Sequence, residues 1–122
     1  MLSLRKIVCG EAKEVVMIVD NNRCLTEEYI NSLEEKTRKR LLAIMENMAK
    51  RGEIINTEMF RHLSGNIYEF KARSARIFCF FHQNLVVCTH GADKPKQRRL
   101  KIEINKAEKM RKTFMNQINK EA

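Results

Sequence analysis

The amino-acid sequence predicts one small α+β domain, in which helices and strands occupy separate stretches of the chain. The segments at 34–51 and 99–119 carry apolar residues at helical spacing, whereas a stretch between them shows short apolar alternations separated by tight turns. The 122 residues suit a single domain, 1–122, because no linker-like composition divides them. The expected order is β-α-α-β-β-β-α, an antiparallel sheet with a helical hairpin and a basic C-terminal helix.

The first half of the chain is expected to hold one strand and two helices. The apolar, β-branched run at 14–19 predicts a strand that ends at an Asp-Asn-Asn turn signal. Thr26 is the expected N-cap of a short helix, because two glutamates follow it in the first turn. A second helix is expected over 34–51, with Gly52 at its C-terminal end. Since the two helices are joined tightly, they are expected to form a hairpin.

The second half predicts a three-stranded antiparallel meander followed by a long helix. The strands are expected at 66–73, 76–82 and 85–90. The turns between them are expected at Ser74-Ala75 and Gln83-Asn84, which would set Arg73 opposite Arg76 and Cys79 opposite Cys88. The final helix is expected over 99–119, with an apolar side of Leu100, Ile104, Ala107, Phe114 and Ile118.

Strand alternation assigns the meander two faces of different character. The core face is expected to hold Tyr68, Phe70, Ala72, Ile77, Cys79, Phe81, Val86, Cys88 and, at its end, His90. The opposite face is expected to hold Ile67, Glu69, Lys71, Arg73, Arg76, Phe78, Phe80, His82, Leu85, Val87 and Thr89. Cations mixed with aromatic rings are typical of a sheet that binds single-stranded nucleic acid. Alternatively, the last helix covers Phe78, Phe80 and Val87 and leaves the charges as a rim.

Charge is concentrated at the C-terminal end of the sequence. The formal net charge is +9, and residues 94–122 contain ten basic side chains against three acidic ones. Such an excess favours a phosphate-binding surface, most simply for RNA, over a merely solvated helix face. The candidate RNA-binding residues are Lys96, Arg98, Arg99 and Lys101.

Targeting and metal-binding signals are absent from the sequence. No apolar stretch approaches the roughly 18 residues that a membrane span needs, and the first residues do not resemble a signal peptide. The four cysteines show no C-x-x-C spacing, so we expect reduced thiols and no metal site. These features predict a cytoplasmic protein without membrane contact.

Four short stretches follow one another in an order that is typical of a known family. They are FRHLSG at 60–65, IYE at 67–69, RIFCFF at 76–81 and VVCTHG at 86–91, and a basic helix follows them. Together with 23–25, 29–33 and the second helix, they resemble the RelE superfamily of bacterial toxins, closest to its phage-derived, HigB-like branch. The sequence departs from that branch at 92–95, where Ala-Asp-Lys-Pro replaces a usual Phe and Lys-Lys pair, and at Arg99-Leu100, where Thr-Pro is usual.

The resemblance implies the toxin of a type II toxin–antitoxin system. Such a toxin inhibits growth as a ribosome-dependent messenger RNA endoribonuclease, and a cognate antitoxin, of the helix-turn-helix type, neutralises it. The implied chemistry uses neither metal nor cofactor: the ribose 2′-OH attacks the adjacent phosphate. That reaction needs a base for the 2′-OH, cations for the developing charge and an acid for the leaving oxygen.

The resemblance also selects candidate catalytic residues. Lys71 and Arg76 match basic positions on the family's active face, where both are expected to be exposed. Arg73 and Lys94 match more loosely. The tyrosine that some relatives use near the last helix has no counterpart here. Histidine is the other side chain that titrates near neutrality. Strand alternation favours His82 for acid–base work, whereas the matching His-Gly pair favours His90.

Two other functions are compatible with the sequence. The ParE branch of the same superfamily inhibits DNA gyrase without catalysis, but the cluster of Lys71, Arg73 and Arg76 favours a ribonuclease. A catalytically decayed toxin that keeps only RNA binding is the third possibility, because the altered segment at 92–95 lies beside the expected active site.

Overall fold

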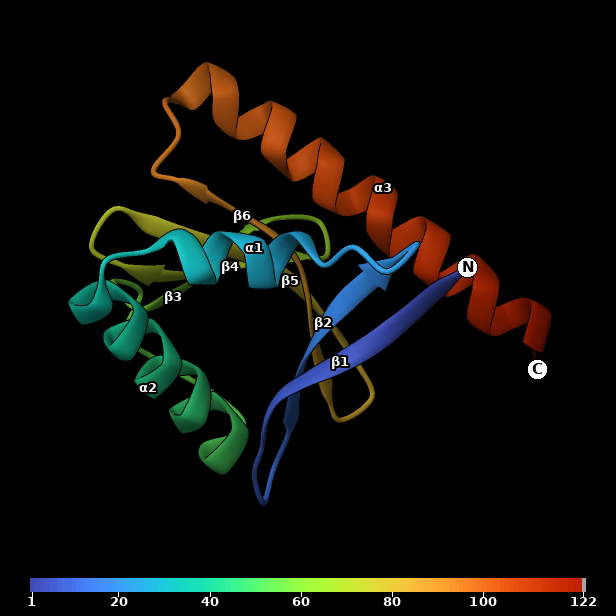
Figure 1. The fold of residues 1–122 in the computed structure, drawn as a ribbon, viewed down its shortest axis with the longest axis horizontal. Helices are drawn as coiled ribbons and strands as arrows, with labels where there is room; N and C mark the ends of the chain where they lie inside the picture. Colours follow the sequence, from blue (N-terminus) through green and yellow to red (C-terminus); the bar gives the residue numbers. More distant parts are fainter. Residues whose placement is uncertain (122) are drawn as a thin grey trace.

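The computed structural model describes residues 1–121 and contains one six-stranded sheet and three helices (Figure 1). In chain order the elements are β1 (Leu2–Cys9), β2 (Glu14–Asp20), α1 (Leu25–Ser32), α2 (Glu35–Arg51), β3 (Phe60–Ser64), β4 (Ile67–Ala72), β5 (Ala75–His82), β6 (Leu85–Asp93) and α3 (Gln97–Glu121). The α+β class is therefore confirmed. The described chain has no helix long and apolar enough to cross a membrane.

The strand order in the sheet is β1-β2-β6-β5-β4-β3. The pairing is antiparallel except between β2 and β6, which run parallel. The prediction of an entirely antiparallel sheet is therefore wrong. The two helices and strands β3 to β5 separate β2 from β6 in the chain. β6, the last strand, returns to the side of β2 and runs parallel to it.

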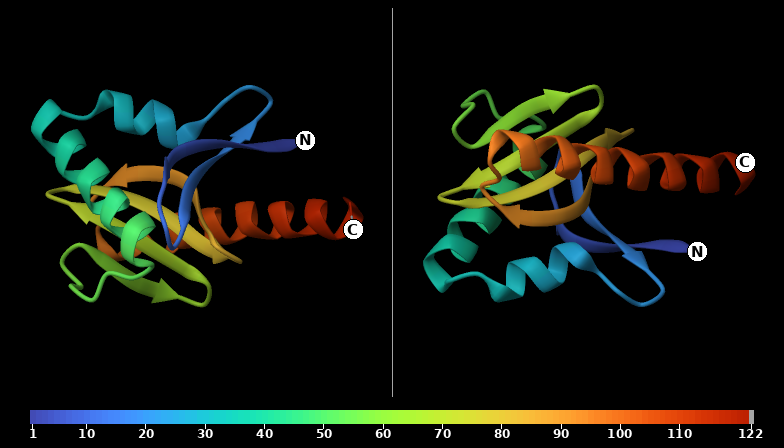
Figure 2. Two further views of the ribbon diagram at one scale, coloured as in Figure 1. Left: turned by 90° about the horizontal axis from the view of Figure 1, so that it is seen from below. Right: turned by 90° about the horizontal axis from the view of Figure 1, so that it is seen from above.

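Helices cover both faces of the sheet, and each face has its own core (Figures 1 and 2). Under α1 and α2 lie Phe70, Ala72, Ile77, Cys79, Val86 and Cys88, with Tyr68 and Phe81 at the margin. Under α3 lie Ile67, Phe78, Phe80 and Val87, packed against Ala107 and Phe114 of the helix. The apolar residues of the two predicted faces are thus confirmed, and α3 covers the aromatic residues of the second face. Two predicted positions are wrong: Arg73 lies in the β4–β5 turn, and His90 lies on the opposite face.

Neither edge strand was predicted from the sequence. β1 and β3 carry charged side chains and are largely exposed, so their apolar alternation is weak. With them the order becomes β-β-α-α-β-β-β-β-α instead of the predicted β-α-α-β-β-β-α. Edge strands pair on one side only and bury little surface, so the sequence need not mark them with a long apolar run.

The helical region differs from the prediction in two respects. The N-cap of α1 is Cys24, and Thr26 lies inside the first turn, where its buried hydroxyl has no hydrogen-bond partner in the described structure. α1 and α2 meet at a corner (Figure 1), because Leu33 and Glu34 are both extended, with ψ of 150° and 144°. The predicted hairpin is therefore wrong. The end of α2 is as expected, since Gly52 adopts a left-handed conformation with φ of 84°.

The two turns of the meander decide which side chains meet. The β5–β6 turn is as predicted, and Cys79 lies opposite Cys88; burial raises the pKa of both thiols. The β4–β5 turn consists of Arg73 and Ser74, so that Lys71, and not Arg73, lies opposite Arg76. Arg73 takes a positive φ of 56°, which a two-residue hairpin turn requires. The register differs from the prediction by two residues, and the faces are therefore preserved.

Candidate functional site

Basic side chains gather at the end of the sheet where the β4–β5 turn meets the β6–α3 loop. The two segments are joined by the Lys94 amide, which donates a 2.6 Å hydrogen bond to the Ser74 carbonyl. This contact brings Arg73 and Lys94 beside the start of α3, which has no acidic residue in its first turn. The positive helix N-terminus adds to their potential. We call this surface the cationic end; it comprises Lys71, Arg73, Lys94, Lys96, Arg98, Arg99 and Lys101.

Most cations of the cationic end have no carboxylate partner among the described residues. Arg73 lies 3.5 Å from Glu34, and both side chains are more than half exposed. Lys71 is half-buried, and its ammonium donates to the Thr57 carbonyl at 3.2 Å. The other five members form no ion pair within residues 1–121. Their charge is thus available to an external anion.

Arg76 is part of the interior, although it was expected to be exposed. Only 7% of its side chain is accessible, and its guanidinium donates to the carbonyls of Arg73 at 2.7 Å and Ala75 at 2.9 Å. Its Nε lies 3.6 Å from the buried carboxylate of Glu69. Arg76 therefore fixes the backbone of the turn that presents Arg73. The expectation of exposure is wrong because a carboxylate on the neighbouring strand compensates the buried charge.

Glu69 and Arg61 complete this buried network, and neither was singled out from the sequence. Glu69 is 1% exposed, and its second oxygen accepts two hydrogen bonds from Arg61, at 2.9 and 2.6 Å. Arg61 and Glu69 are direct cross-strand partners in β3 and β4. The register would have revealed the pair, but no strand was predicted at 60–64.

His90 lies on the face opposite to the predicted one. A β-bulge pairs Cys79 with Cys88 and Phe78 with His90, so one extra residue in β6 turns His90 toward α3. The ring stacks on Phe78 with centroids 4.9 Å apart. Its Nε2 lies 3.3 Å from the Glu103 carboxylate of α3, and its Nδ1 lies 3.0 Å from the Thr89 hydroxyl.

The surroundings of His90 suit a neutral imidazole. Burial, and then the charge of Lys106, lowers the pKa of His90 to about 4 despite the nearby Glu103. A neutral ring can donate from Nε2 to Glu103, and its Nδ1 then shares the single proton of the Thr89 hydroxyl with the Phe78 carbonyl, which lies 3.2 Å from that hydroxyl. Because the side chain is 3% accessible and contacts Glu103 of α3, His90 helps to hold α3 on the sheet.

The other candidate histidine lies far from the cationic end. His82 closes β5 at the β5–β6 turn and packs edge-on against Phe114. Since Ala75 begins the same strand at the cationic end, the rise of a β-strand separates the two positions by about 23 Å. His82 is thus not brought together with Lys71, Arg73 or Lys94.

A tyrosine does approach the cationic end, although the sequence comparison gave it no role. Tyr29 of α1 donates a 2.8 Å hydrogen bond to Asp93 at the end of β6, and burial followed by this bond raises the pKa of the phenol. Its ring lies directly over Gly91, where a Cβ atom would stand 2.1 Å from the ring. The glycine of the His-Gly pair is therefore required by the ring of Tyr29.

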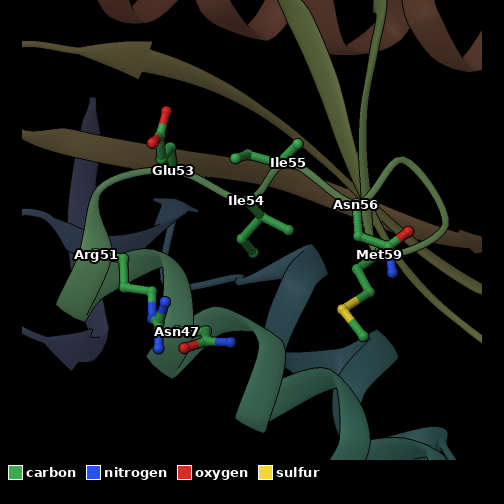
Figure 3. A pocket seen from close by; sticks show the side chains of 7 residues that line it. All are labelled: Asn47, Arg51, Glu53, Ile54, Ile55, Asn56 and Met59. Carbon is green, nitrogen blue, oxygen red and sulfur yellow. The ribbon is translucent and has the colours of Figure 1, made fainter.

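A metal centre and a pocket are the two other kinds of candidate site. Among the described residues, no group of three or more His, Cys, Asp or Glu side chains is arranged to hold a metal ion. A hollow of about 570 Å³ lies between the end of α2 and the loop that follows it (Figure 3). Its lining includes one basic and one acidic residue, Arg51 and Glu53, beside Ile54 and Met59. Such a balanced lining lacks the charge excess of the cationic end.

Comparison with known families identifies the class of protein. Residues 28–112, more than two thirds of the chain, match the family model described as phage derived protein Gp49-like (DUF891). The matched segment runs from α1 into α3 and contains the whole cationic end. The chain belongs to this Gp49-like family, which is associated with toxin–antitoxin systems and RelE-like toxins. A comparison with curated proteins found no match.

Proposed function

We propose that this protein is the toxin of a toxin–antitoxin pair and acts as a ribosome-dependent messenger RNA endoribonuclease in the cytoplasm. The observation that carries the proposal is the cationic end: Arg73, Lys94 and the start of α3 are held together, and within residues 1–121 Glu34 is the one carboxylate that forms an ion pair with them. Membership of the Gp49-like family supports the same function. A cognate antitoxin of the helix-turn-helix type completes the proposed system.

In the proposed reaction, the ribose 2′-OH loses its proton as its oxygen attacks the adjacent phosphorus. The bond to the 5′-oxygen of the next nucleotide breaks, and that oxygen takes up a proton. The products are a 2′,3′-cyclic phosphate and a 5′-hydroxyl. Lys71, Arg73 and Lys94 are assigned to the phosphate, where fixed cations stabilise the charge of the transition state. Arg76 and His90 are assigned supporting roles, since one holds the β4–β5 turn and the other holds α3. His82 is assigned none.

RNA binding without cleavage is the second candidate function, and one observation favours it. None of the described histidines lies at the cationic end: His62 contacts Gly65 at the β3–β4 turn, His82 ends β5 and His90 is buried. Cations alone bind a phosphate, whereas cleavage also requires proton transfer. The two functions differ in whether RNA is cut.

The experiment is induced expression of the protein without an antitoxin, followed by primer extension on translated messages. The proposal expects growth arrest and discrete cuts within reading frames. Arg73→Ala and Lys71→Ala are each expected to lower the cleavage rate by about 10²- to 10³-fold, because each removes a cation aimed at transition-state charge. The matched control is Lys50→Ala, an exposed lysine at the end of α2 that should leave cleavage unchanged.

The outcomes separate the candidate functions. Arrest with intact messages and accumulating gyrase–DNA complexes would identify a ParE-like inhibitor instead. Purified protein that binds ribosomes while messages stay intact would identify the RNA-binding function. Cleavage that survives both Arg73→Ala and Lys71→Ala would show that the cationic end is not the active surface.

A further inference from the structure

A groove runs between α3 and the end of β2, well away from the first turn of α3. It consists of two adjoining hollows of about 290 and 210 Å³, which share Asp20, Lys109 and Met110. Each hollow is smaller than a typical small-molecule site of about 300 to 1,000 Å³. Hollows of this size suit the side chains of a peptide segment better than a cofactor.

The floor of the groove is aliphatic. Leu2, Ile18, Leu25 and Met110 line it, and the lining contains no aromatic ring. One end is fixed by a pair of 2.8 Å hydrogen bonds between the Leu2 backbone and the Gln117 side chain, which tie the start of β1 to α3. The floor is therefore a preformed apolar surface.

The rim of the groove is positively charged. Lys106 and Lys109 are exposed and have no ion-pair partner among the described residues. Arg23 pairs with Glu28 at 2.9 Å, but both side chains are at least half exposed, so water and salt weaken this pair. Asp20 is the acidic residue of the lining.

We propose that this groove docks an acidic protein segment that carries apolar anchor side chains. The aliphatic floor would accept the anchors, and the lysine rim would pair with the acidic residues around them. A nucleic acid fits less well, because bases are held by stacking on rings and the groove lining contains none. Resting on the proposed function, we identify the partner that carries this segment as the antitoxin.

The position of the groove separates docking from catalysis. Along α3, Lys109 lies about 16 Å from Arg98 of the cationic end, given the rise of 1.5 Å per residue. A partner anchored in the groove can extend a neighbouring segment over the cationic end. Substitutions in the groove should therefore weaken partner binding and leave the toxic activity of the free protein intact.

The test measures fluorescence anisotropy with the full chain and a fluorescein-labelled, glutamate-rich helical peptide that carries two leucines one turn apart. We expect the combined change Lys106→Glu and Lys109→Glu to weaken peptide binding about tenfold or more. Met110→Gln, which keeps the side-chain length, should also weaken it. The matched control combines Lys112→Glu with Lys120→Glu, the same charge change on exposed positions of α3, and should bind almost as well as the unaltered protein.

Each other result overturns the proposal. Equal losses in the groove and control variants would show that only net charge matters. An unaffected groove variant, or a peptide that does not bind, would exclude the groove as a docking site. It would also be excluded if the groove variant bound the peptide normally and lost binding only to a labelled single-stranded RNA. Growth arrest by the unaltered protein is measured separately. Its absence would contradict the proposed toxin function and leave the peptide result standing.

Discussion

The two faces of the sheet differ in the polarity of their buried side chains. The face under α1 and α2 is apolar, with Phe70, Ile77 and Val86 packed on the helices. The face under α3 is also apolar at its centre, but it contains the buried charged or imidazole side chains of Glu69, Arg76, His90 and Glu103. Arg76 supports the β4–β5 turn, and His90 joins β6 to Glu103 of α3. The second face therefore combines packing with the support of a charged surface.

This difference indicates which face of the sheet tolerates substitutions. An apolar core tolerates substitutions that conserve volume, because no hydrogen bond depends on one particular side chain. A buried ionic network adds little net stability, yet the loss of one member leaves an uncompensated charge. The face that supports the cationic end should thus be far less tolerant of conservative changes than the face under α1 and α2.

The largest effect is expected for Glu69→Gln, which keeps the shape and removes the charge. Arg76 would then be a buried cation without a carboxylate, and the free energy of unfolding should fall by about 3 to 5 kcal/mol. On the other face, Met45→Leu conserves volume at a fully buried position and should cost less than about 1.5 kcal/mol. Urea denaturation of both variants measures the contrast.

A double variant sharpens this comparison. Glu69→Leu combined with Arg76→Met removes both charges, and its stability should exceed that of the less stable single variant, because no buried charge is left alone. If Glu69→Gln and Met45→Leu lost equal stability, the two faces would not differ as we argue.

The sequence predicted which apolar residues share a face better than it predicted the positions of the buried polar residues. Period-two alternation correctly placed Phe70 and Ile77 on one face and Phe78 and Phe80 on the other, and helical spacing identified the packed side of α3. Apolar burial is a property of every second residue, so it survives an error of two in register. The edge strands β1 and β3 were missed because exposed strands have no such pattern.

The errors in the site have specific physical causes. Moving the turn to Arg73-Ser74 changes the partner of Arg76 from Arg73 to Lys71, and a single bulge reverses the face of His90. Neither change leaves a clear signal in the sequence, because both depend on backbone geometry that the tertiary structure selects. The burial of Arg76 depends on Glu69, whose pairing with Arg61 required knowledge of β3.

The second prediction concerns pH and the buried imidazole. The folded protein holds the pKa of His90 at about 4, below the ordinary value of 6.5. Between these two pH values the unfolded chain binds one more proton than the folded protein. The contribution of neutral His90 to the free energy of unfolding is therefore fully present above pH 6.5 and is lost as the pH falls toward 4. The loss amounts to at most about 3 kcal/mol.

The measurement compares unfolding free energies of the unaltered protein and His90→Gln at pH 7.5 and pH 4.5. The unaltered protein should lose more stability on acidification, because the other titrating groups are shared by both proteins. Identical pH dependence would mean that His90 is accessible to protons in the folded state, and that the α3 face is less closed than its packing indicates.

The smallest effect on stability is expected at the exposed start of α3. Lys96, Arg98, Arg99 and Lys101 are all exposed, so replacing them with glutamine should change stability by no more than about 0.5 kcal/mol each.

Binding to the ribosome should respond instead. If these residues contact ribosomal RNA, each lost phosphate contact should reduce the slope of log affinity against log salt by roughly 0.7 to 0.9. Ribosome co-sedimentation across a salt series measures that slope, and Lys50→Gln on α2 serves as the control. A normal slope in the quadruple variant would assign these four cations to solvent alone, and the RNA contact would then have to rest on Lys71, Arg73 and Lys94.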